Sequence, residues 1–104
     1  GAGTGYYAFR IAQKIPEGKL YAVEVQDAFI QQLKTSAKAK GLANVVVVKG
    51  TATAPNLPPS SIDLAFMVDV YHELEYPLEM LQAIHTALKQ NGKLLLIEYR
   101  GEDP

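Results

Sequence analysis

The sequence predicts an α/β protein in which a mostly parallel sheet lies between two layers of helices, a three-layer sandwich. Short blocks of β-branched and aliphatic residues alternate with longer segments of helical period, which is the pattern of βαβ units. The chain opens on GAGTGYY, a glycine-rich turn of the kind that joins a strand to a helix in such a sheet. A chain with this fold normally begins with a strand, whereas this sequence begins with the turn that follows one.

The first predicted helix covers residues 5–15. Phe9, Ala12 and Ile15 fall on one side of it, as the helical period requires. The helix ends before Pro16, because the proline ring disfavours helical backbone in the preceding residue.

The segment KLYAVEV at residues 19–25 predicts a strand, and a second helix follows it. Asp27 is the predicted N-cap of this helix, and Gly41 is the residue that ends it. The apolar stripe of the helix consists of Ile30, Leu33 and Ala37. The run VVVV within residues 44–49 predicts a strand that is covered on both faces.

A loop, two strands and a last helix complete the pattern. TATAPNLPPSS contains three prolines and predicts a loop, IDLAFMV at 62–68 predicts a strand, and DVYHELEY predicts a connector. Pro77 suits the first turn of the last helix, where its missing N–H has no helical partner. The stripe of that helix consists of Leu78, Leu81, Ile84 and Leu88. Asn91 with Gly92 is predicted to end it, and KLLLIEY at 93–99 is the fourth strand.

The composition excludes several classes of protein. Apolar residues make up 48% and charged residues 20% of 104, which is typical of one globular domain. Without cysteine, the chain has no disulfide and no thiolate metal site. The net charge is −1 and the lysines are scattered, so no nucleic-acid footprint is present. The longest apolar runs are too short to cross a bilayer, so no membrane partner is expected and the predicted location is the cytoplasm.

The glycine turn and an acidic strand end together predict a ligand site. A strand, a glycine turn and a helix bring backbone N–H groups and the positive end of a helix dipole to one point. The glycines miss the dinucleotide pattern GxGxxG, because Tyr6 stands where its third glycine belongs, and no P-loop signature is present. Glu24 follows about 20 positions later, where doubly wound folds hold a ribose diol. The alternatives are a flexible loop for the glycines and a solvated strand end for Glu24.

Four blocks in order resemble the class I S-adenosylmethionine-dependent methyltransferases. The likeness is greatest to small bacterial members in which a DVYHE stretch follows the fourth strand of the family's sheet, the strand that IDLAFMV matches here. The blocks are GAGTG, LYAVEVQ, VKGTATAPNLPPSSIDLAFMVDVYHEL and LEMLQAIHTALKQNGKLLLIEYR, and they cover essentially the whole chain. The resemblance implies the core of a Rossmann-like fold that lacks its first strand and its closing strands. It also implies S-adenosylmethionine as the cofactor.

The resemblance implies a role for each matching position. Those that would bind the cofactor are Gly1, Gly3 and Gly5 under its methionine end, Glu24 on the ribose hydroxyls, Val25 and Gln26 beside the adenine, Thr51 and Ala52 at the adenine edge, and Asp69 near the amino-acid moiety. Those that would face the methyl acceptor are Tyr71 and His72. Family members commonly carry an acidic residue at the position of Thr51. Most of them also have an acidic residue two positions before the first glycine of the turn.

In the family's sheet, the strand before the glycine turn lies between the KLYAVEV and IDLAFMV strands. Its absence would open a gap of about 10 Å and leave backbone groups unpaired on both sides. We therefore expect the sequence to be an excerpt of a longer chain. The alternative is that a second copy supplies a strand, which would make the protein a homo-oligomer.

The predicted activity is in-line transfer of a methyl group from S-adenosylmethionine to a small molecule. His72 is the candidate general base, with a packed structural histidine as the alternative, and His85 is expected to have a structural or surface role. His72, Glu73 and Glu75 are not expected to hold a metal. A second hypothesis is a noncatalytic methyltransferase-like remnant acting as an oligomeric binding module. A nicotinamide oxidoreductase is the third, and the register of the glycines disfavours it.

Overall fold

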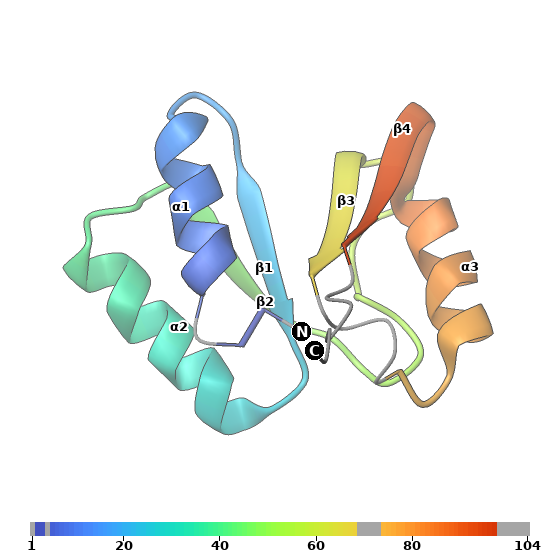
Figure 1. Cartoon of the computed structure of the whole chain (residues 1–104), viewed down its shortest axis with the longest axis horizontal. Helices are drawn as coiled ribbons and strands as arrows, with labels where there is room; N and C mark the ends of the chain where they lie inside the picture. Colours follow the sequence, from blue (N-terminus) through green and yellow to red (C-terminus); the bar gives the residue numbers. More distant parts are fainter. Residues whose placement is uncertain (1, 4, 69–73, 98–104) are drawn as a thin grey trace, which may run out of the picture. The chain divides into compact units, whose positions relative to one another are not determined.

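The computed structural model of the chain describes residues 2–3, 5–68 and 74–97. The chain divides into two compact units, Gly1–Thr51 and Ala52–Pro104. The first unit contains α1 (Tyr6–Lys14), β1 (Leu20–Glu24), α2 (Asp27–Ala39) and β2 (Val45–Lys49) (Figure 1). The second contains β3 (Ile62–Val68), α3 (Pro77–Ala87) and β4 (Leu88–Ile97). The predicted order of helices and strands is confirmed.

The described strands form two parallel pairs, β1 with β2 and β3 with β4. In the first unit the register runs from Leu20 opposite Val45 to Glu24 opposite Lys49 without a shift. Parallel pairing with a helix in each connection is the predicted βαβ arrangement. The carboxyl ends of β1 and β2 therefore lie at the same edge of their sheet.

The first unit holds most of the buried apolar residues in the described part of the chain. They are Ala8, Phe9, Ala12, Leu20, Ala22, Ile30, Leu33 and Ala37. Residues along β1 alternate between buried and half-buried, so α1 and α2 cover one face of it closely. The prediction that both faces of VVVV are covered is wrong, because β2 has no buried residue and Val46 is 37% exposed.

The ends of the first two helices follow from local chemistry. α1 stops at Lys14, two residues before Pro16, as predicted. Gly41, with φ of 68°, ends α2: its N–H donates to the Lys38 carbonyl, and the N–H of Leu42 donates to the Ala37 carbonyl. This pair of bonds is the Schellman motif.

Asp27 is not the N-cap of α2, which corrects the prediction. Gln26 occupies the cap position with extended backbone, and Asp27 is the first helical residue. The Asp27 carboxylate accepts a hydrogen bond from Lys49 Nζ at 2.8 Å instead of bonding its own helix. Its negative charge still complements the positive end of the helix dipole.

The second unit ends its helix earlier than predicted. α3 finishes at Ala87 and not at Asn91 with Gly92, and β4 begins at Leu88. The N–H groups of Ser60 and Ser61 donate to the Thr86 and Ala87 carbonyls at 2.9 and 2.8 Å, which satisfies the last turn of the helix.

Gly92 belongs to an irregular part of the β3–β4 ladder. β3 advances from Ile62 to Leu64 while β4 advances from Leu88 to Lys93. A Cβ at Gly92 would lie 3.0 Å from the Ile62 carbonyl oxygen, so glycine permits this close approach. In this unit Ile84 and Ala87 are buried, whereas Leu78 of the predicted stripe is 63% exposed.

Candidate functional site

The glycine turn lies at the carboxyl end of β1. The N–H of Ala2 donates to the Val23 carbonyl at 3.0 Å, and the N–H of Gly5 closes a turn onto the Ala2 carbonyl at 3.0 Å. On the side of β1 that faces β2, the Leu20 N–H donates to the Asn44 carbonyl, and the Glu24 carbonyl accepts from the Gly50 N–H. Because successive residues of a strand point their backbone groups to opposite edges, Val23 and Ala2 meet on the edge that β2 leaves open.

Gly3 and Gly5 need to be glycine for different reasons. Both have left-handed backbone, with φ of 58° and 89°. A Cβ at Gly5 would lie 2.6 Å from Cε2 of Phe9 and 2.9 Å from Cδ2 of Leu33, so the hydrophobic core fills this position. A Cβ at Gly3 would meet nothing within 4 Å. Gly5 therefore serves packing, and Gly3 leaves a cradle that a side chain would fill.

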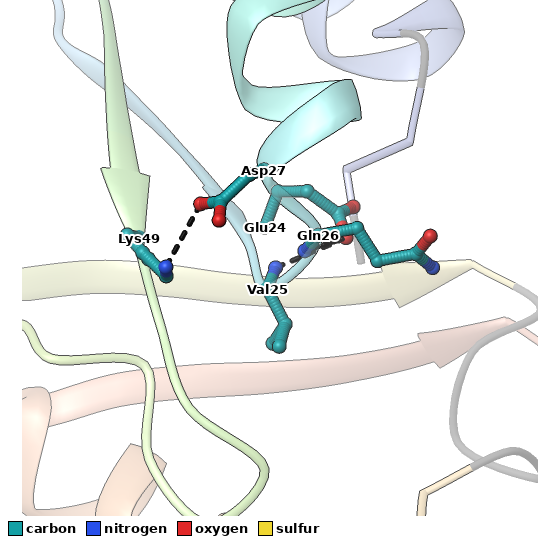
Figure 2. A network of polar contacts seen from close by, with 5 residues as sticks. All are labelled: Glu24, Val25, Gln26, Asp27 and Lys49. Atoms are coloured by element: carbon teal, nitrogen blue, oxygen red, sulfur yellow. Dashed lines mark hydrogen bonds and ion pairs between the residues drawn. The ribbon is translucent and has the colours of Figure 1, made fainter.

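Glu24 brings its carboxylate to this turn. Oε1 accepts a hydrogen bond from the Gly3 N–H at 2.8 Å. Oε2 accepts hydrogen bonds from the N–H groups of Val25 and Gln26 at 3.0 Å each, and Figure 2 shows these two residues beside it. Glu24 is 4% exposed, because it is the last residue of β1 on the face that the helices cover. Three backbone donors from two segments thus fix both carboxylate oxygens.

The charge state of Glu24 follows from these contacts. Burial on its own raises the pKa of the carboxyl, because desolvation disfavours the ionised form. The hydrogen bonds from the N–H groups of Gln26, Gly3 and Val25 oppose burial, and the pKa lies below its ordinary value. Glu24 is therefore an ionised acceptor at neutral pH.

The residues that follow β1 and β2 lie at the same edge of the sheet as Glu24. Val25 is 43% exposed and Gln26 is exposed, so both present surface beside Glu24. Asp27 and Lys49 form an ion pair nearby, as Figure 2 shows. Thr51 is exposed and comes directly after Gly50, whose N–H donates to the Glu24 carbonyl at 3.0 Å.

The structure thus brings Gly3, Glu24, Val25 and Gln26 together. Ala52 is an exposed residue at the start of the second unit. Four predicted site residues lie outside the described residues, namely Gly1, Asp69, Tyr71 and His72. The pairing of Asp27 with Lys49 was not predicted, although Asp27 begins α2 and Lys49 ends β2 at the carboxyl edge of one parallel pair.

The described part of the chain contains no group of three or more His, Cys, Asp or Glu side chains placed to hold a metal ion. None of its helices combines the length and the apolar character needed to cross a lipid bilayer.

The model of the methyltransferase domain family matches residues 1–94, which is most of the chain and includes the glycine turn and Glu24. The chain belongs to the class I S-adenosylmethionine-dependent methyltransferases. The resemblance predicted from the four sequence blocks is thereby confirmed. So is the α/β fold with a Rossmann-like parallel sheet.

Relatives and solved structures support this family membership. A demethylmenaquinone methyltransferase of Chlamydia muridarum is 30% identical over 93% of the chain, which spans 41% of that protein. The structure of an S-adenosylmethionine-dependent methyltransferase from Aquifex aeolicus superposes with a TM-score of 0.91 at 30% identity, over 100% of this chain and 58% of that one. The structure of YcgJ from Bacillus subtilis superposes with a TM-score of 0.85 at 25% identity, over 95% of this chain and 42% of that one. The chain spans less than half the length of the curated relative.

Proposed function

We propose that this methyltransferase binds S-adenosylmethionine at the carboxyl end of β1 and methylates a small molecule. The observation that carries the proposal is the Glu24 carboxylate held 2.8 Å from the Gly3 N–H, at the glycine turn. Parallel sheets bind ligands outside the carboxyl ends of their strands, and an acid at this distance from the glycines suits a ribose diol.

The residues present fit this cofactor. Open space beside Gly3 allows a ligand to approach the backbone of the turn. α1 begins at Tyr6, and its N-cap Gly5 provides no side-chain cap, so the geometry of the helix leaves its first N–H groups without helical acceptors. A carboxylate such as that of the methionine moiety is the kind of group that these donors and the helix dipole favour.

The ribose and the adenine would engage the next residues. The ionised Glu24 accepts hydrogen bonds, and ribose hydroxyls donate them. Because backbone N–H groups hold both oxygens in place, the carboxylate is oriented before the ligand arrives. The exposed side chain of Val25 offers the adenine an apolar surface, and Gln26, Thr51 and Ala52 would border the base.

S-adenosylmethionine supplies a methyl group that its sulfonium has already activated for transfer. The task of the chain is then to align the cofactor with an acceptor, and alignment alone is worth effective molarities of about 10⁵ to 10⁸ M. We keep Asp69 as a pocket residue, Tyr71 as an acceptor contact and His72 as the general base for acceptors that must lose a proton. We also place the protein in the bacterial cytoplasm.

Calorimetric titration of the full-length protein with S-adenosylmethionine tests the proposal. Gly3→Val should weaken binding at least tenfold, because its side chain would fill the cradle at the turn. Gly41→Val is a matched control: Gly41 also has a left-handed backbone and open space at Cβ, but it lies at the far end of α2. Equal affinity for both variants would contradict the proposal, and absence of heat with the wild type would favour the noncatalytic remnant.

A further inference from the structure

A cavity between α1 and α2 forms a second candidate site. Its volume is about 340 Å³, within the range of small-molecule sites. Side chains from one face of α1 and from the last turns of α2 line it, including Tyr6, Arg10, Gln13, Ser36 and Lys40. Gly5 and the buried Phe9 give it an apolar floor.

The charges around this cavity are all positive. Arg10 and Lys40 line it, and no carboxylate does. Neither cation forms an ion pair in residues 2–3, 5–68 and 74–97. Helices α1 and α2 carry four basic residues and a single acid, Asp27, and that acid is paired with Lys49 of β2. The positive charges that line the cavity are therefore not neutralised by neighbouring carboxylates in the described residues, although the whole chain has a net charge of −1.

Arg10 is already oriented at the cavity. Its guanidinium lies over the Tyr6 ring, 5.2 Å from the ring centre, and Nη1 lies 3.4 Å from the Tyr6 hydroxyl. Tyr6 is in turn braced by Tyr7 in an edge-on contact at 4.9 Å. A guanidinium stacked on a ring keeps its N–H edge for the two-pronged recognition of phosphate or carboxylate.

We propose that this cavity binds a small organic anion, with its phosphate or carboxylate between Arg10 and Lys40 and its apolar part against Phe9. Ser36 and Gln13 add neutral hydrogen-bonding groups to the same lining. The site is separate from the proposed cofactor site, because its charged and polar lining comes from the helices and none of it from Glu24 or Gly3.

Titration of the full-length protein with phenyl phosphate tests this site, with benzoate and inorganic phosphate as parallel probes. Phenyl phosphate should bind saturably and more tightly than inorganic phosphate, because it also fills the apolar floor. If benzoate binds saturably and phenyl phosphate does not, the site is specific for carboxylates. Amide resonances of Gln13 and Ser36 should shift in NMR spectra on binding.

Matched variants separate a built site from general attraction. Arg10→Gln and Lys40→Gln should each weaken phenyl phosphate at least tenfold. Lys38→Gln removes the same charge from the same turn of α2, but roughly 160° around the helix from Lys40, and should change affinity less than twofold. Gly3→Val should leave phenyl phosphate binding intact, so failure of the cofactor proposal and of this one are distinguishable.

Three outcomes would overturn the inference. The first is the absence of saturable binding for phenyl phosphate and benzoate alike. The second is an equal loss in Lys38→Gln, which would show nonspecific attraction. The third is a concentration-dependent dimer in sedimentation that Arg10→Gln abolishes, because it would give the cavity to a second copy of the chain.

Discussion

The Glu24 carboxylate links the stability of the protein to pH. Its pKa is lowered in the folded state, because the hydrogen bonds from three backbone N–H groups, together with the positive charge of the N-terminal amino group, outweigh burial. A group with a depressed folded pKa contributes its full stability above the unfolded value, about 4.3 for glutamate. That contribution is lost as pH falls from there through the folded pKa.

We therefore predict that Glu24→Gln loses about 1.5–3 kcal/mol at pH 7, the worth of hydrogen bonds to a charged group. The difference from the wild type should shrink as pH falls below about 4, because the wild type then loses its own carboxylate. Urea unfolding from pH 7 to pH 3 measures both. Glu17→Gln, which removes an exposed carboxylate, is the control and should change neither. A pH-independent difference for Glu24→Gln would contradict the assignment.

Gly5 should tolerate no side chain, for a reason unrelated to ligand binding. A Cβ there would overlap the Phe9 ring at 2.6 Å and crowd Leu33, and the left-handed backbone adds strain. We predict that Gly5→Ala costs about 2–5 kcal/mol, from overpacking of about 1–3 kcal/mol plus about 1–2 kcal/mol for the backbone. Thermal unfolding measures it. The double variant Gly5→Ala with Phe9→Leu should recover part of the loss, and a lone Gly5→Ala of wild-type stability would contradict the packing.

At the scale of elements, Asn44 joins the end of α1 to the beginning of β2. Its side-chain amide donates to the Ala12 and Ile15 carbonyls at 3.0 Å each, while its own carbonyl accepts from the Leu20 N–H at 2.9 Å. One residue thus satisfies carbonyls in the last turn of the helix and continues the β1–β2 ladder.

We predict that Asn44→Ala destabilises the protein by about 1–3 kcal/mol, the range for carbonyls deprived of two donors. Asn44→Asp should cost more, because a carboxylate of the same shape would face two carbonyl oxygens. Denaturant unfolding compares them. Equal stability of the Asp and Ala variants would mean that solvent and not the amide satisfies these carbonyls.

The sequence predicted the elements well where the signals were local. Pro16, Gly41 and the three prolines of the loop set their boundaries through backbone geometry that nearby residues determine. The prediction failed where a residue distant in the sequence supplied the partner. The N–H groups of Ser60 and Ser61 bond the last carbonyls of α3, which ends at Ala87. The Asp27 side chain bonds Lys49 and does not cap α2. Two-sided burial of VVVV also failed, because burial depends on what covers a strand and not on its composition.

For the molecule as a whole, the same limit applies to the site. The spacing in the sequence predicted that Glu24 would lie near the glycine turn and form a ligand site with it, because both lie at the carboxyl edge of a parallel sheet. The three N–H donors to its carboxylate were not predictable, since they depend on the backbone conformation of both the glycine turn and the loop between β1 and α2. Roles for Asp69, Tyr71 and His72 stay predictions, as these residues lie outside the described ones.

Ligand-induced stabilisation tests the family assignment on the whole protein. A ligand that binds only the folded state at 100 times its Kd adds about 2.7 kcal/mol, which raises the Tm by several degrees. We predict such a shift with S-adenosylmethionine and with its demethylated product, and none with NAD at equal concentration. The reason is that the glycines at 1, 3 and 5 do not match the turn that cradles a pyrophosphate. Differential scanning fluorimetry measures the shifts, and a larger effect of NAD would favour an oxidoreductase.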